Sequence, residues 1–194
     1  MLDRLGQLKT RCSGLLVTEL GCCSCKGKSQ SVENFSCLSL NIPAGAETSE
    51  PASLVDCIEE TFKKEETDDT WYCTYCGNRT GQKHSWIYSS PIILVLHLKR
   101  FQLSRNGYHK DKVAVKLPEL FAIGQDRYRI IGKVNHIGRR MTSGHYTAEI
   151  NAGEWKRCDD TTIVQIGRMD VNSREAYIVF CEKIDGTVIP AGNA

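Results

Sequence analysis

The sequence has no hydrophobic run long enough to span a membrane, and residues 1–8 are too polar and too short for a secretory signal. A membrane-spanning helix needs about 20 apolar residues, whereas the longest apolar run here is Pro91 to Leu96. Its length and β-branched content are typical of a buried strand. The sequence therefore gives no reason to expect a membrane partner.

The sequence also lacks a concentration of charge of one sign. It has 25 Lys and Arg against 23 Asp and Glu, which gives a formal net charge of +2. The two signs are interleaved, and no basic run mixed with aromatic residues occurs. Nucleic-acid-binding proteins concentrate positive charge on one face or along one helix. A zinc-stapled domain that binds nucleic acid is therefore disfavoured.

Cysteine, by contrast, is abundant, with ten in 194 residues. Without a secretory signal, this number indicates a reducing compartment, where thiols serve as ligands, nucleophiles or core residues rather than in disulfides. We therefore expect an intracellular protein of the cytoplasm or the nucleus. Six cysteines stand singly in apolar or strand-like contexts, and we interpret most of them as small core residues: Cys12, Cys23, Cys37, Cys57, Cys158 and Cys181.

The other four cysteines form two Cys-x-x-Cys pairs, Cys22 with Cys25 and Cys73 with Cys76. Two intervening residues let both thiolates of a tight turn converge on one ion, and two such turns complete a tetrahedral four-sulfur site. The sequence therefore predicts one structural Zn²⁺ with no coordination position open for catalysis. A redox dithiol is the weaker alternative, because neither pair opens a helix in a βαβ unit.

The pattern of apolar and turn residues predicts a β-rich α+β domain. One helix should open at Ser53, with Asp56 completing an acidic capping box. The strands are expected at Leu15–Leu20, Phe35–Leu40, Lys83–Tyr88, Ile92–Leu98, Val113–Lys116, Tyr128–His136, Gly144–Ile150, Glu154–Cys158 and Ala176–Phe180. Lys26–Ser31 should be a polar connection, and Asn106-Gly107 and Gly138–Ser143 should be turns.

Turn residues at Asn151–Gly153 predict that the strands on either side form a hairpin. This hairpin would bring His145 close to Asp159 and Asp160. A histidine held by a carboxylate is fixed in one tautomer, which both thiol proteases and metal sites require. On the hairpin alone, a surface histidine beside two solvated acids is an equally good interpretation.

Taken in order, the motifs of the chain resemble those of the ubiquitin-specific protease (USP) family of thiol deubiquitinases. The motifs are the paired Cys-x-x-Cys sequences and the helix between them, Ser90-Pro91-Ile92-Ile93-Leu94-Val95-Leu96-His97-Leu98-Lys99-Arg100-Phe101, Lys112–Pro118, Tyr128–Gly138, Ser143-Gly144-His145-Tyr146, Trp155–Asp160 and the closing strand Ala176–Phe180.

The resemblance implies a papain-like fold described as a hand, with zinc-bearing fingers and an antiparallel palm. Residues 1–11 would be a lead-in, and residues 12–184 a partial USP catalytic domain. Within it, the fingers would cover about 12–86 and the palm about 87–184, with 185–194 as a disordered tail. The implied partners are ubiquitin and ubiquitinated proteins.

The resemblance also implies roles for individual residues. His145 would be the general base of the thiol reaction, Asp159 would orient its imidazole, and Asp160 would be a neighbouring backup acid. Gly144 and Tyr146 would line the channel for the C-terminal tail of ubiquitin. Residues 100–110 and 138–143 would form the two loops that border this channel.

The match fails at the nucleophile, because the family's N-terminal cysteine box has no counterpart here and no Asn-x-Cys sequence occurs. The thumb subdomain that carries that box is not found either. We therefore expect the chain as given to be inactive alone, and to supply only the histidine–aspartate half of the site. Either it is the C-terminal portion of a longer deubiquitinase, which is the favoured interpretation, or it is a ubiquitin-binding pseudoenzyme or scaffold.

Overall fold

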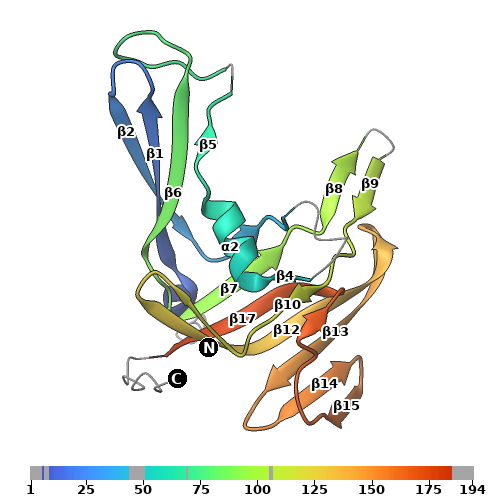
Figure 1. The fold of residues 1–194 in the computed structure, drawn as a ribbon. Helices are drawn as coiled ribbons and strands as arrows, with labels where there is room; N and C mark the ends of the chain where they lie inside the picture. Colours follow the sequence, from blue (N-terminus) through green and yellow to red (C-terminus); the bar gives the residue numbers. More distant parts are fainter. Residues whose placement is uncertain (1–5, 7–8, 44–50, 69, 105–106, 185–194) are drawn as a thin grey trace, which may run out of the picture.

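The computed structural model describes residue 6 and residues 9–43, 51–68, 70–104 and 107–184, and they form two main sheets (Figure 1). The first sheet has the order β2-β1-β6-β5, from Lys28–Phe35, Gly14–Cys22, Gly81–Ser89 and Glu65–Glu66. The second has the order β15-β14-β13-β12-β17-β7-β3, from Thr162–Gln165, Trp155–Asp159, Ser143–Asn151, Asp126–Arg140, Ala176–Ile184, Ile93–Leu98 and Leu38–Leu40, and β11 (Leu120–Ile123) also pairs with β12.

Strand β2 corrects the sequence-based prediction for this region. The segment 26–31 was expected to be a connection, and a strand was expected over 35–40. Instead β2 runs over Lys28–Phe35 antiparallel to β1, and residues 38–40 form the separate strand β3 in the other sheet. All of β2 except Phe35 is exposed, so it lacks the alternation of apolar and polar residues by which strands are recognised in a sequence.

Strand β12 pairs with β11, β13 and β17 in the second sheet, and it is longer than predicted. The segment 138–143 was expected to be a turn, but β12 extends into it as far as Arg140. Strand β13 then begins at Ser143. The register between the two strands shifts between Ile137 and Arg140. Gly138 lies at this shift with φ of 143°, a backbone conformation that side-chain-bearing residues rarely adopt. The predicted turn is therefore confined to residues 141–142, and the glycine at the start of the predicted segment marks a β-bulge close to the end of the strand.

Helix α2 (Leu54–Phe62) confirms the predicted helix and its start. Ser53 accepts a hydrogen bond from the Asp56 backbone, and the Asp56 carboxylate accepts one from the Ser53 backbone, so the capping box is complete. Leu54 and Ile58 are buried in the main core. That core lies against β3, β7, β12 and β17, so β3 and α2, which fall within the predicted span of the fingers, pack on the larger sheet.

The remaining strands are short. β4 (Ala52–Ser53), β10 (Val115–Lys116) and β16 (Asn172–Ser173) form a small sheet, and β8 (Phe101–Ser104) forms a hairpin with β9 (Gly107–Lys110). Among the described residues, no helix is long and apolar enough to cross a membrane. The predicted tail, 185–194, and most of the predicted lead-in, 1–11, lie outside the described residues.

The prediction that most of the single cysteines belong to the core was wrong. Cys57 and Cys181 are buried, whereas Cys12 and Cys158 are partly exposed and Cys23 and Cys37 are exposed. Burial raises the pKa of the Cys57 thiol to about 12 and also raises that of Cys181. These two thiols are therefore inert core residues at neutral pH.

Candidate active site and metal centre

The predicted histidine–carboxylate pair is formed at the open end of the β13–β14 hairpin. The hairpin turns where Gly153 has φ of 90°, and Asn151 pairs with Trp155 and Ala148 with Cys158. This register carries His145 Nε2 to 2.5 Å from Asp159 Oδ1. The strand periodicity and the turn residues predicted that these residues lie close together, and the resemblance to the USP family predicted the contact itself.

The contact fixes the chemistry of the imidazole. The hydrogen bond that His145 donates to the Asp159 carboxylate and the negative charge of Asp159 raise the pKa of His145, and the charge of Asp160 adds to this effect. Because Nε2 is engaged by Asp159, Nδ1 is the nitrogen left to exchange a proton with a reacting group. The two side chains are 45% and 51% exposed, so a reacting group can approach the ring from solvent.

Asp160 lies at the turn between β14 and β15, with φ of 48°. Its carboxylate, that of Asp159 and the His145 imidazole each offer a ligand atom within 4.8 Å of the other two. The structure therefore brings all three predicted residues together. Within this group, the hydrogen bond joins His145 to Asp159, and Asp160 lies beside the pair.

Gly144 and Tyr146 both lie against His136, a residue to which the sequence analysis gave no separate role. A Cβ at Gly144 would overlap with His136 Nε2. The Tyr146 ring meets the His136 ring edge-on, with centroids 5.0 Å apart, and Phe101 does the same from another side at 5.2 Å. Gly144 is thus required by packing within the chain, whether or not a ligand also approaches it.

Several charged residues around the site are buried, and sequence reasoning missed them. Arg100 is fully buried and donates to the carbonyls of Ala176, Val113 and Ser173. Lys110 is nearly as buried and donates to the His136 carbonyl and the Glu175 carboxylate. Nothing in the sequence signalled this, because a charged residue within a polar or alternating stretch is by default solvent-exposed.

The four predicted metal ligands converge at the end of the first sheet. Their sulfur atoms all lie within 4.8 Å of one another. Cys22 Sγ is 3.7 Å from Cys76 Sγ, and Cys25 Sγ is 3.6 Å from Cys73 Sγ. Zinc–sulfur bonds of about 2.3 Å in a tetrahedron place the sulfurs about 3.8 Å apart. The spacing of the four thiols therefore fits one Zn²⁺ without rearrangement.

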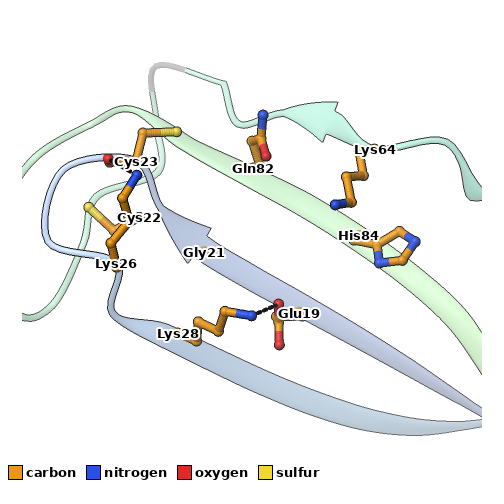
Figure 2. Close-up of a pocket in the computed structure, with 9 residues that line it drawn as sticks. All are labelled: Glu19, Gly21, Cys22, Cys23, Lys26, Lys28, Lys64, Gln82 and His84. Atoms are coloured by element: carbon orange, nitrogen blue, oxygen red, sulfur yellow. Dashed lines mark hydrogen bonds and ion pairs between the residues drawn. The ribbon is translucent and has the colours of Figure 1, made fainter.

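The surrounding backbone also fits a thiolate site. Hydrogen bonding from the backbone of Cys25 lowers the pKa of the Cys22 thiol to about 6. The Gly27 N–H donates to Cys25 Sγ at 3.4 Å and lowers the pKa of Cys25, but the neighbouring thiols outweigh it and raise that pKa to about 12, a repulsion that a bound cation would offset. Figure 2 shows the side chains of Cys22 and Cys23 pointing in different directions beside a pocket that includes Lys28 and its ion-pair partner Glu19. Cys23 is outside the cluster, as the sequence analysis expected, and it is exposed.

The fold and the site define a β-rich domain that carries a histidine–carboxylate pair and a separate cluster of four cysteines with the spacing of a metal site. The family model described as "UCH: Ubiquitin carboxyl-terminal hydrolase" matches residues 7–180. The chain belongs to this family, and the USP resemblance of its motifs is confirmed.

Individual relatives support the same assignment. The chain is 35% identical over 149 residues to ubiquitin carboxyl-terminal hydrolase 5 of Arabidopsis thaliana, which covers 68% of this chain and 16% of the relative. It is 30% identical over 169 residues to ubiquitin hydrolase B of Dictyostelium discoideum, covering 81% of this chain and 36% of the relative. The chain thus spans well under half the length of these curated relatives.

Solved structures agree on the fold. The SAGA DUB module of Ubp8, Sgf11, Sus1 and Sgf73 bound to monoubiquitin matches with a TM-score of 0.78 and 27% identity, over 92% of this chain and 42% of that chain. The same module bound to ubiquitin aldehyde matches with a TM-score of 0.78, 26% identity and the same coverage. The predicted β-rich USP-like fold is therefore confirmed.

Proposed function

We propose that this chain supplies the histidine–aspartate half of the active site, and the ubiquitin-binding surface, of a thiol-dependent deubiquitinase. The reaction is hydrolysis of the isopeptide or peptide bond at the C-terminus of ubiquitin. The observation that carries the proposal is the contact between His145 and Asp159, which is already formed in this chain at 2.5 Å. The family membership of the chain supplies the reaction class.

In the proposed mechanism, His145 Nδ1 takes the proton of a cysteine thiol and later returns it to the leaving lysine amine. The Asp159 carboxylate holds Nε2 and stabilises the imidazolium that forms in between. The raised pKa of His145 favours this charged form. A thiol beside an imidazolium is more acidic than a free one, so a thiolate would be present near neutral pH.

We propose that the nucleophile is not one of the cysteines of this chain. Four cysteines cluster at the proposed metal site, and Cys57 and Cys181 are buried. Cys158 is next to Asp159 on a strand, so its side chain points to the opposite face of the sheet. None of Cys12, Cys23 and Cys37 has an interaction with the His145–Asp159 pair among the described contacts. The thiol would then come from a segment or a chain that joins this one.

The partners of the reaction are proposed to be ubiquitin and ubiquitinated proteins, since two solved structures of the similar Ubp8 module are bound to monoubiquitin and to ubiquitin aldehyde. Gly144 and Tyr146, on the strand that carries His145, would line the channel for the ubiquitin tail, and the side chain of Tyr146 is exposed there. We propose one structural Zn²⁺ on the four clustered thiols. Reduced thiols of this kind require an intracellular environment, in the cytoplasm or the nucleus.

A ubiquitin-binding pseudoenzyme is the second candidate, favoured by the lack of a cysteine-box sequence. The test combines turnover of a ubiquitin–fluorophore substrate with calorimetry against free ubiquitin. We expect binding and no turnover by the chain alone. Turnover restored by adding the cysteine-bearing half of a relative would establish the half-site, whereas binding without any restoration would favour the pseudoenzyme. Heat indistinguishable from buffer would refute both ubiquitin-binding candidates.

A further inference from the structure

Three charged side chains form a row across strands β12, β13 and β14, beside the catalytic candidates. In the strand register, Lys133 is opposite Glu149 and Glu149 is opposite Arg157. Side chains alternate along a strand, so residues two or four positions apart share a face. Glu149 is therefore on the face of His145, and Arg157 on the face of Asp159. Glu149, Arg157 and Asp159 line one groove of about 550 Å³.

The carboxylate of Glu149 is the centre of this row. Arg157 donates to Glu149 Oε1 from two guanidinium nitrogens, at 3.1 and 3.4 Å. The other oxygen, Oε2, accepts from the Asp170 backbone N–H at 3.0 Å and lies 3.4 Å from Lys133 Nζ. The side chains of Lys133 and Glu149 are only 1% and 2% exposed. One buried carboxylate thus ties together three strands and the segment after β15.

The second anchor of the row is Lys133. Its ammonium donates to the Asp170 carbonyl at 2.8 Å in addition to its ion pair with Glu149. Asp170 follows Met169, which is buried in the main core. The row therefore connects strand β14 not only to its neighbour but also to a segment that the core holds in place.

The His145–Asp159 pair needs such an anchor, because burial does not hold it. Both side chains are about half exposed, and β15, the strand beyond β14, is exposed along its whole length. A buried charge that loses its partner is strongly destabilised. Strand β14 therefore cannot shift relative to β13 without breaking the two hydrogen bonds from Arg157 to Glu149, and Asp159 is two residues from Arg157 on β14.

We propose that Lys133, Glu149 and Arg157 are positioning residues: they hold β14 in register against β13 and thereby keep the Asp159 carboxylate on the His145 imidazole. The inference rests on the proposed function, since it assigns a task relative to the proposed catalytic pair. Its evidence, however, is the geometry of the three strands, and its test does not depend on turnover or on ubiquitin binding.

The test is the pKa of His145, measured by NMR titration of the chain as it stands. The acidic groups that face His145 are Asp159 and Asp160, so the titration reports directly on whether Asp159 is in place. Arg157→Gln is the first variant, because Arg157 is half exposed and its loss leaves no buried cation unpaired. We expect Arg157→Gln to lower the pKa of His145 by about 0.5 or more, which changes the protonation constant about threefold. We expect Arg157→Lys to lower it less, because the positive charge is kept.

The matched control is Arg129→Gln. Arg129 lies on β12, in the same sheet as Arg157, and is also half exposed. It forms a cross-strand ion pair with Glu182 at 3.1 Å. We expect this variant to leave the pKa of His145 unchanged. If Arg157→Gln does not fold, the double variant Lys133→Met/Glu149→Gln removes both buried charges together and should give the same fall.

An unchanged pKa of His145 in a folded Arg157→Gln or double variant would overturn the inference and reduce the row to a structural ion cluster. An equal fall in the Arg129→Gln control would overturn it as well, because the effect would then not be specific to this row. Failure of the chain to bind ubiquitin would count against the proposed function and would leave the titration result as it stands.

Discussion

Gly144 lies directly against the imidazole of His136, so closely that a single added carbon would overlap with Nε2. His136 cannot easily move away, because its side chain is buried among Phe101, Tyr146 and Tyr177. Gly144, the residue before the proposed base His145, is therefore constrained by His136, which packs against it.

We expect Gly144→Ala to lower the free energy of unfolding by about 1–3 kcal/mol, the usual cost of overpacking a filled site. Urea denaturation followed by circular dichroism measures this change. Gly167→Ala is the control, since nothing lies within 4 Å of a Cβ at Gly167. Equal stability of the two variants would show that the His136 contact does not constrain this position.

Replacing Asp159 should change the titration of His145. The hydrogen bond to Asp159 is the largest contribution to the raised pKa of His145. We therefore expect the pKa to fall in Asp159→Asn, as measured by NMR. Asp160→Asn should lower it less, because Asp160 contributes the smallest of the raising effects. A larger fall for Asp160→Asn would mean that the two acids have exchanged roles.

The same pair predicts a pH dependence of stability. The pKa of His145 in the folded chain is raised above its ordinary value, so the pair's stabilisation is fully present below about pH 6.5, the unfolded value. It is lost as pH rises through the higher folded pKa. The urea midpoint of the natural chain should thus exceed that of Asp159→Asn at about pH 6.5. The two midpoints should converge once the pH is above the folded pKa of His145. A difference that grows with pH would contradict the assignment.

Removing one proposed zinc ligand should remove the metal. We expect about one equivalent of zinc in the natural chain purified under reducing conditions, and loss of most of it in Cys76→Ser, measured by elemental analysis. Cys23→Ser is a matched control, because Cys23 adjoins a ligand and is outside the cluster. Retention of zinc in Cys76→Ser, or its loss in Cys23→Ser, would show that the ligand set is different.

Arg100→Lys should be destabilising although the charge is kept. The guanidinium reaches backbone carbonyls of Val113, Ser173 and Ala176 at once, which a single ammonium cannot do. Each buried carbonyl left unpaired costs about 1–3 kcal/mol. Arg129→Lys is the control, since its partner is one exposed carboxylate. Equal unfolding free energies of the two variants would contradict the role given to Arg100.

Local signals in the sequence were sufficient for several parts of the molecule. The capping box gave the start of α2, the Cys-x-x-Cys spacing gave the metal site, and the turn at 151–153 gave the hairpin with His145 and Asp159. In each case the residues that interact are within one turn or one hairpin of each other, or belong to two copies of one short motif. The physical constraint is then visible in the spacing itself.

The exposed strand β2 could not be recognised in this way, and neither could the buried charges. Strand β2 is held by backbone pairing to β1, which leaves no pattern in its own side chains. Lys133 and Glu149 are buried because two strands and the segment at Asp170 meet around them.

The sequence by itself thus determined the family, the cluster of four cysteines and the histidine–carboxylate pair, because these depend on short spacings and residue chemistry. Only the tertiary structure decided which charged residues are buried, that Gly144 is constrained by His136, and that Glu149 links β12, β13 and β14 beside the site. Burial depends on all the segments that pack around a residue. Segments that are distant in the sequence leave no local pattern from which their packing can be predicted.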